Sequence, residues 1–340
     1  MRSEAPRSLV AKASLAFLVV ANACQETNGV DDADKHFLNL PPGATAEEVG
    51  KAIDGRPGAG EGLSTPGHGR CYFVVVRDGE RHGAAYRPEA FHVVVGAGVT
   101  LPEGALVVRR VWAASGQIDG ANEQPERLGV SLVVEPGARK PYSDAVRAAV
   151  KTFVEALAAR VPLHPDCVLA MEEIAYTNKH PADEAERELA KAARRDVPVP
   201  PTDGQVVIRS GDREIRVDVE LRSELQEHTK DGIEVGMMFR TRFDGENRGM
   251  LFEYANADYR HFWMRNCTIP IDVAYIHRGR IEEIHAMEPA FGVPPRSLRF
   301  YDGRAVANLA LEMPAGWFEK NGVKAGDEVD VRIPGRPKPP

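Results

Sequence analysis

The sequence predicts two folded parts, an α/β sheet domain followed by a β-rich α+β domain. Between residues 67 and 196, continuous apolar runs alternate with helical patterns, which is typical of a sheet packed against helices. A Pro-rich stretch at 197–204 then predicts a stiff linker. From 205 to 335, short strand-like runs predominate. A length of 340 residues also suits two domains better than a single core.

The first part contains five runs that predict buried strands. They are 71–77, 91–96, 105–112, 128–134 and 168–171. Its clearest helix begins after Ser143, which can act as the N-cap, and has an apolar stripe at i, i+3 and i+4 spacing from Val146 to Leu157. A charged amphipathic helix is expected at 182–195.

The second part contains eight runs that predict strands. They are 205–209, 214–221, 250–252, 261–264, 271–276, 280–287, 306–313 and 328–333. One helix, at about 223–239, is expected between the second and third of them.

Residues 1–24 have the pattern of an export signal. Basic residues precede an apolar run at 15–21, and a small-residue cleavage pattern ends at Cys24. The pattern resembles a bacterial lipoprotein signal, so Cys24 is the lipidation candidate and would tether the protein to a membrane. We therefore expect an exported protein of the periplasm or cell envelope, with an uncleaved cytoplasmic tail as the alternative. Residues 25–66, rich in Gly, Pro, Asp and Glu, predict a flexible tether with one short helix at 46–53.

The net charge limits the possible binding partners, and the spacing of the cysteines limits the possible metal sites and disulfides. A net charge of −7 and a pI near 5.9 provide no basic footprint, which excludes nucleic-acid binding. The cysteines lack paired zinc-finger spacing. Cys71 and Cys167 precede equivalent points on two strands expected to be neighbours, so they could pair in an oxidising compartment.

Three motifs in the first part resemble one enzyme family. They are Ala90-Phe-His-Val-Val-Val-Gly96, Val111-Trp112 followed by Gln117-Ile-Asp-Gly-Ala-Asn122, and Arg127-Leu-Gly-Val-Ser-Leu132. In order and spacing they are similar to the type-2 N-acetylmuramoyl-L-alanine amidases and peptidoglycan recognition proteins, over about residues 70–195. The resemblance implies an amidase-like α/β fold with a zinc ion held by three protein ligands, which cuts the amide between muramic acid and L-alanine.

The positions that match the family's zinc ligands have changed in this chain. Where the resemblance places the first His, the sequence has Val76-Arg77-Asp78, and where it places the second His it has Met171. His180 stands at the third position and is the only retained metal-ligand candidate. A neutral thioether such as that of Met171 suits Cu(I) and not zinc. We therefore expect no zinc and no other cofactor.

Other positions implied by the resemblance have changed as well. Phe91 matches the family's catalytic Tyr and lacks the hydroxyl, and Asn122 matches a substrate-side His. Glu172 and Glu173 could supply a general base, although adjacent strand residues face opposite sides, so at most one would reach the site. None of these vestigial positions is expected to be catalytic.

These observations favour a non-catalytic cell-envelope protein that binds peptidoglycan or muropeptides through a zinc-less amidase-like domain. Two alternatives remain open: an active zinc-dependent amidase with substituted ligands, and a purely structural interaction protein.

The second part resembles a different family, the uncharacterised DUF192 domain. The resemblance rests on Val235-Gly-Met-Met-Phe-Arg240, Arg248-Gly-Met-Leu-Phe252, Phe262-Trp-Met-Arg-Asn266, Ile269-Pro-Ile-Asp-Val-Ala-Tyr275 and Leu311-Glu-Met-Pro-Ala-Gly-Trp317. That family implies no agreed activity. Trp263, Asn266 and Asp272 are the pocket candidates, because they are polar-capable residues embedded in apolar sequence. Asp272 is expected either to face a cleft or to be buried against a backbone donor.

Overall fold

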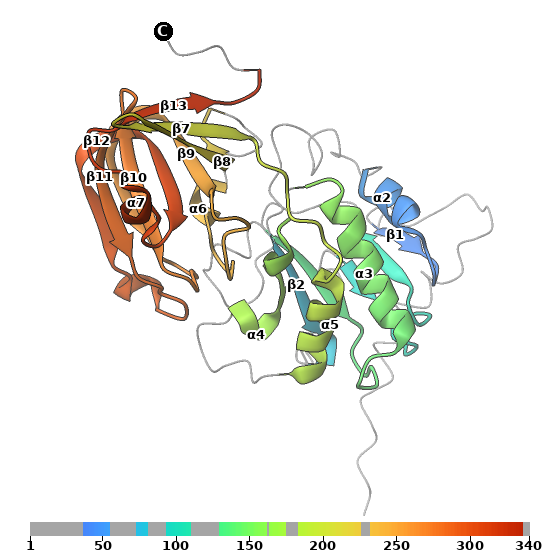
Figure 1. Cartoon of the computed structure of the whole chain (residues 1–340). Helices are drawn as coiled ribbons and strands as arrows, with labels where there is room; N and C mark the ends of the chain where they lie inside the picture. The colour runs from blue at the N-terminus through green and yellow to red at the C-terminus, as the bar shows by residue number, and fades with distance from the viewer. Residues whose placement is uncertain are drawn as a thin grey trace, which may run out of the picture.

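The computed structural model describes residues 37–54, 73–80, 93–109, 129–161, 163–174, 183–225 and 232–335. It shows two parts side by side, a mixed α/β sheet and a strand-rich closed barrel (Figure 1). Residues 197–203, in the predicted linker, form no regular structure between them. Among the described residues, no helix combines the length and the apolar character needed to cross a membrane.

The first part is a six-stranded sheet in the order β1-β4-β3-β5-β2-β6. Its strands are β1 (Phe37–Leu40), β2 (Phe73–Asp78), β3 (Val93–Val95), β4 (Leu106–Arg109), β5 (Gly129–Val134) and β6 (Val168–Ala170). Strands β3, β5, β2 and β6 run parallel, whereas β1 and β4 form an antiparallel edge. The carboxyl ends of the four parallel strands therefore meet at one edge of the sheet, where α/β folds usually bind ligands.

Helices α2 (Ala46–Asp54), α3 (Asp144–Ala158) and α5 (Glu184–Arg194) pack beside this sheet (Figure 1). The predicted cap of α3 is present, because the Oγ of Ser143 accepts a hydrogen bond from the backbone N–H of Val146 at 3.3 Å. The apolar stripe of α3 is buried, with Val150 and Phe153 fully covered. Both helices predicted in this part of the sequence are thus confirmed.

Part of the predicted tether belongs to the sheet domain. Strand β1 pairs with β4, and α2 contributes the buried side chains of Val49 and Ile53 to the main core. The helix expected at 46–53 is therefore present, but it is packed and not part of a free tether. Its few apolar residues are spaced to form one face, and only the tertiary fold supplies the surface that covers them.

The predicted strand at 168–171 ends one residue early. Met171 begins a short helix, α4 (Met171–Ile174), so Glu172 and Glu173 do not occupy alternating strand positions. Two carboxylates explain the change: Glu173 accepts from the N–H of Ala170 at 2.6 Å, and Glu186 accepts from the N–H of Met171 at 2.7 Å. These side chains therefore accept hydrogen bonds from the backbone N–H groups that, in a longer strand, would bond to the neighbouring strand.

The second part is a closed barrel in the order β10-β11-β13-β7-β8-β9-β12. Its strands are β7 (Gly204–Ser210), β8 (Arg213–Ser223), β9 (Arg248–Trp263), β10 (Ile271–His277), β11 (Arg280–Met287), β12 (Phe300–Pro314) and β13 (Glu328–Arg332), and the short helix α7 (Trp317–Asn321) follows β12. All neighbours are antiparallel except β8 and β9. The runs predicted at 250–252 and 261–264 are the two ends of the single long strand β9.

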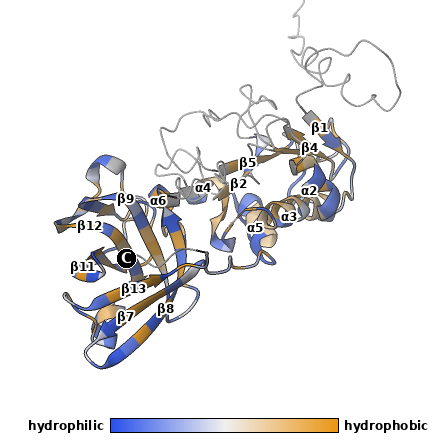
Figure 2. Cartoon of the chain, turned by 90° about the horizontal axis from the view of Figure 1, so that it is seen from above, coloured by the Kyte–Doolittle hydropathy of each residue, from blue (hydrophilic) through white to orange (hydrophobic). Residues whose placement is uncertain are grey.

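The distribution of hydrophobic residues along the strands differs between the parallel sheet and the barrel (Figure 2). Strand β2 is buried at every position, as expected for a parallel strand covered on both faces. Barrel strands alternate instead: Leu251 packs in one apolar cluster of the barrel, while its neighbours Met250 and Phe252 pack in another. Closure of the barrel leaves its strands without a free edge.

The helix predicted at about 223–239 is wrong where the structure describes it. Strand β8 continues to Ser223, residues 226–231 lie outside the described residues, and in the described part that follows a single turn of helix, α6 (Gly232–Val235), precedes a turn at 236–239. Phe239 has a φ of 63°, which a helix does not allow. Its backbone N–H donates to the carbonyl of Asn266 at 2.8 Å, so a contact with a distant loop replaces the next helical turn.

The same turn joins the two parts of the molecule. The ring of Phe239 packs edge-to-face on Phe73 of β2, with centroids 5.3 Å apart. Thr241 donates from its backbone N–H and its hydroxyl to Asp166, at 2.8 and 2.7 Å. His164, 1% exposed, lies 3.0 Å through Nε2 from a carboxylate oxygen of Asp244.

His164 is held in its neutral form. Its Nδ1 accepts from the backbone N–H of Asp166 at 3.1 Å, which leaves the proton on Nε2, facing Asp244. Burial, together with the nearby positive charge of Arg240, lowers the pKa of His164 although Asp244 opposes the shift. Protonation would add a second proton to the ring, at Nδ1, where it would face the backbone N–H of Asp166 and remove that hydrogen bond.

We expect acid to weaken this interface through His164. A folded-state pKa below the ordinary value means that the unfolded chain takes up the proton first, so stability is lost as the pH falls below about 6.5. His164→Gln cannot titrate, so it should be less stable than the wild type at pH 7.5 and approach it as the pH falls to 5. Urea unfolding at several pH values measures the difference, with His261→Gln, at an exposed position, as the control. A constant gap between wild type and His164→Gln would contradict this assignment.

Candidate functional site

Two of the positions implied to hold zinc do lie together. Arg77 is near the carboxyl end of β2, and Met171 follows β6 directly. Because Val76 pairs with Ala170 across these parallel strands, Arg77 and Met171 occupy adjacent strand ends. Phe91, Asn122 and His180, together with the side chain of Glu172 and with Cys24 and Cys71, lie outside the described residues.

The two described positions do not fit zinc. The side chain of Arg77 is only 3% exposed, and its guanidinium carries a permanent positive charge and no lone pair for a metal. Met171 offers a soft, neutral sulfur. In the described ranges, no group of three or more His, Cys, Asp or Glu side chains is arranged to hold a metal ion.

Charged groups close this edge of the sheet instead. The Nζ of Lys140 forms ion pairs with Asp78, buried near the end of β2, and at 2.6 Å with Asp183, the N-cap of α5. Burial alone would lower the pKa of Lys140, but hydrogen bonds to Asp183 and Asp78 outweigh it and raise the pKa. Lys140 therefore stays charged and fixes the backbone of the segment that leads into α3.

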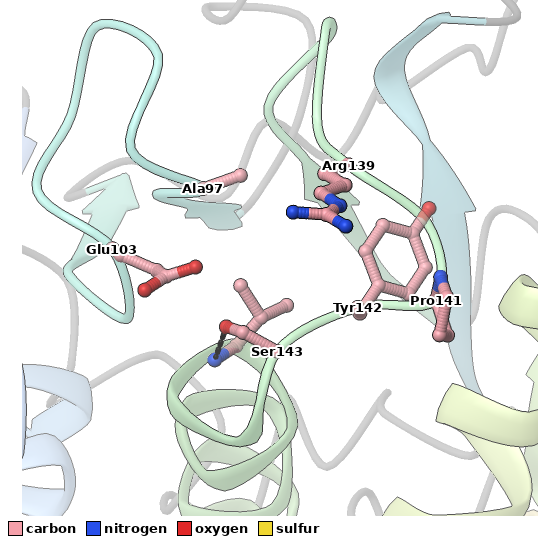
Figure 3. Close-up of a pocket in the computed structure, with 7 residues that line it drawn as sticks. Ala97, Glu103, Arg139, Pro141, Tyr142 and Ser143 are labelled. Carbon is pink, nitrogen blue, oxygen red and sulfur yellow. Dashed lines mark hydrogen bonds between the residues drawn. The ribbon is translucent and has the colours of Figure 1, made fainter.

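A pocket of about 350 Å³ lies next to this segment, between the loop after β3 and the first turn of α3 (Figure 3). Its lining consists of Ala97, Glu103, Arg139, Pro141, Tyr142, Ser143 and Val146. The carboxylate of Glu103 and the guanidinium of Arg139 extend into it from opposite walls. None of these residues was predicted as a site residue, because loop residues carry no periodic signal.

Glu135, directly after β5, fixes the loop that carries Glu103. Its buried carboxylate accepts backbone N–H groups from Ala97 at 2.8 Å, Leu101 at 3.0 Å and Val99 at 3.3 Å, and it also bonds Thr100 through the backbone and the hydroxyl. These donors replace the water that burial removes from the carboxylate. The loop is therefore held in one conformation before any ligand arrives.

Two glycines allow the same loop to fold tightly. A Cβ on Gly96 would lie 2.2 Å from the carbonyl oxygen of Pro102, across the base of the loop. Gly104 has a φ of 81° and approaches Ala145 in the first turn of α3. Both positions require glycine for steric reasons.

The three pocket candidates of the barrel contact different surroundings. Trp263 stacks on Phe300, which is 52% exposed, with ring centroids 6.0 Å apart. Asn266 is buried at a positive φ beneath the turn at 236–239. Asp272 is buried and accepts from the backbone N–H of Gly316 at 2.8 Å, which is the second of the two arrangements expected for it. Burial raises the pKa of Asp272 despite that bond.

A buried charge cluster on the barrel was not among the predicted site residues. The carboxylate of Glu220 on β8 accepts hydrogen bonds from Nη1 and Nη2 of Arg240, at 2.7 and 2.6 Å, and further bonds from Arg248 and Arg222. Burial would raise the pKa of Glu220, but these arginines outweigh it and lower the pKa to about 2. Polar residues at alternate positions of a strand are typical of a solvent-facing side, but here Glu220 and Arg222 are buried, and Arg240, directly after the turn at 236–239, is bound to Glu220.

Glu312 on β12 is not stabilised by hydrogen bonds from arginines in the way that Glu220 is. It is 4% exposed, and its Oε2 has no hydrogen-bond partner among the described residues. Burial raises its pKa to about 8, with Arg240 and Arg222 opposing the shift. Its appearance in the apolar run 307–312 was the sequence signal that could have identified it.

The two cysteines that the structure describes are poor nucleophiles. Cys167 is free and buried, and Cys71, with which it could pair, lies outside the described residues. Burial raises the pKa of Cys167 to about 12 and that of Cys267 well above its ordinary value. Neither therefore forms a thiolate readily.

We expect Glu135→Gln to loosen the pocket wall. The substituted amide places N–H groups against backbone N–H donors, which should cost about 1–3 kcal/mol of unfolding free energy. Hydrogen exchange at Val99, Thr100 and Leu101 should rise together with that loss. Glu103→Gln on the same loop is the matched control, since Glu103 is exposed and should leave exchange unchanged.

We expect Glu312→Gln to stabilise the protein at neutral and alkaline pH. The unfolded carboxyl ionises above about pH 4.5 and the folded one only near 8, so Glu312 makes folding less favourable as pH rises between these values. At pH 7 the gain should reach up to about 3 kcal/mol, and it should shrink toward pH 4.5. Chemical unfolding across that range measures it, with the exposed Glu319→Gln as control. A gain that does not depend on pH would rule out ionisation as the cause.

Among the comparisons with known proteins, one family model matches, and its match lies in the barrel. No curated protein matches the chain. A solved structure from Sinorhizobium meliloti 1021, named as a candidate transcription regulator, is 24% identical over 39% of this chain and 98% of its own, with a TM-score of 0.34. A protein of unknown function from Novosphingobium aromaticivorans DSM 12444 is 27% identical over 37% of this chain and 83% of its own, with a TM-score of 0.31. Residues 206–331, which span nearly the whole barrel, match the family DUF192, described as Uncharacterized ACR, so the resemblance predicted for the C-terminal half is confirmed.

Proposed function

We propose that this is a cell-envelope protein whose first domain binds peptidoglycan or muropeptides without cutting them. The observation that carries the proposal is the pocket at the carboxyl edge of the parallel strands, the same edge at which Arg77 and Met171 stand at positions implied to bind zinc. Ligand pockets of α/β sheets lie at this edge.

The absence of hydrolysis follows from the donor set in this proposal. Amide cleavage in the family would need a metal to polarise the carbonyl and to acidify water. A guanidinium and a thioether at adjacent strand ends supply neither function. The site would therefore hold its ligand through charge and shape, with no resident cofactor.

Export to the envelope, and a tether through Cys24, belong to the same proposal. Peptidoglycan lies outside the cytoplasmic membrane, so the ligand requires the export that the pattern of residues 1–24 predicts. The role of the barrel stays open within this proposal.

We expect the mature chain to be retained on purified sacculi. A double variant, Glu103→Ala with Arg139→Ala, should lose at least about tenfold in affinity, because both charged groups in the pocket are removed. The matched control is Glu184→Ala with Arg195→Ala, which removes the same two charges from exposed positions on and after α5.

The same preparations answer the question of hydrolysis. Incubation of sacculi with the protein and added zinc should release no muropeptides. Retention no greater than that of an unrelated protein of equal charge would remove the binding proposal in favour of a structural interaction protein. Muropeptide release by a preparation with stoichiometric zinc would instead establish the active amidase.

A further inference from the structure

We infer that the pocket beside α3 takes a ligand end that carries both an ammonium and a carboxylate, as in an amino-acid or short-peptide zwitterion. The inference rests on the proposed function, because it names the chemistry that the same pocket would recognise. It comes from one juxtaposition: Glu103 and Arg139 extend into one space from opposite walls (Figure 3).

Neither charge is paired among the described residues. In the part of the chain that the structure describes, Glu103 and Arg139 form no ion pair with each other or with another side chain. By contrast, Asp144 and Arg147 at the start of α3 pair with each other at 2.6 Å. Two opposite charges that face one pocket without meeting can each be matched by a ligand that carries both signs.

Both walls of the pocket are held in place by contacts outside the pocket. Glu135 binds the backbone of the loop that carries Glu103, and the ion pairs of Lys140 fix the segment next to Arg139. The cap of α3 at Ser143 fixes the floor. The ligand would therefore spend little binding energy on ordering the backbone.

The rest of the lining limits the ligand to small side chains. Ala97, Pro141, Tyr142 and Val146 contribute apolar surface to the lining. A space of about 350 Å³ is at the small end of ligand pockets and suits a dipeptide of small residues. The N-terminal end of α3 lies on this floor and favours a nearby carboxylate.

The test uses the full chain and D-alanyl-D-alanine as the probe, measured by titration calorimetry. Its N-acetyl derivative lacks the ammonium, and its C-terminal amide lacks the carboxylate. We expect the parent dipeptide to bind saturably and each derivative to bind about tenfold more weakly, since each loses one charge-assisted contact.

Two variants assign the contacts. Arg139→Gln should bind the dipeptide and its amide equally, and Glu103→Gln should bind the dipeptide and its N-acetyl derivative equally. Arg195→Gln and Glu184→Gln, at exposed positions elsewhere, should retain both preferences.

Equal binding of the three probes to the wild type, or no saturable binding, would overturn the inference. Sacculus retention is measured separately, so retention without charge preference removes only the zwitterion site and leaves the proposed function. Equal affinity for L-alanyl-L-alanine would support a zwitterion site but would assign it to general peptides and not to cell-wall material.

Discussion

Carboxylates that accept backbone N–H groups determine the backbone conformation at two parts of the sheet's carboxyl edge. The buried carboxylate of Glu135 holds the loop after β3. At the end of β6, the half-buried Glu173 and the buried Glu186 accept the N–H groups of Ala170 and Met171. A carboxylate can be buried only where hydrogen-bond donors replace its water. Glu135 therefore fixes the backbone of one wall of the pocket, because the loop that it holds carries Ala97 and Glu103.

Cationic side chains occupy the part of this edge where the resemblance implies a metal. Arg77 is buried beside Met171, and Lys140 connects Asp78 to Asp183. These groups provide fixed positive charge at the edge of the sheet. This charge is the electrostatic feature on which the proposed binding function rests.

Two acidic residues of the barrel lie in opposite electrostatic environments. Glu220 is surrounded by Arg222, Arg240 and Arg248 and remains ionised, whereas Glu312 is buried with an oxygen that has no partner in the described part of the chain. Polar side chains kept at a cost in stability are candidates for function. Arg240 also acts on His164 of the first part, so the charge on the barrel and the interface between the two parts are linked.

The sequence by itself determined the elements that depend on local patterns. Continuous apolar runs predicted β2 and β5, and the spacing of apolar residues with Ser143 as cap predicted α3, because burial and capping leave a signal within one turn or one strand. The tertiary structure alone decided that the second sheet closes, that residues 236–239 form a turn, and that Glu103 and Arg139 face each other. These features rest on contacts between residues far apart in the chain. No local pattern records whether a polar residue on a strand will meet water or, like Glu312, be covered by another segment.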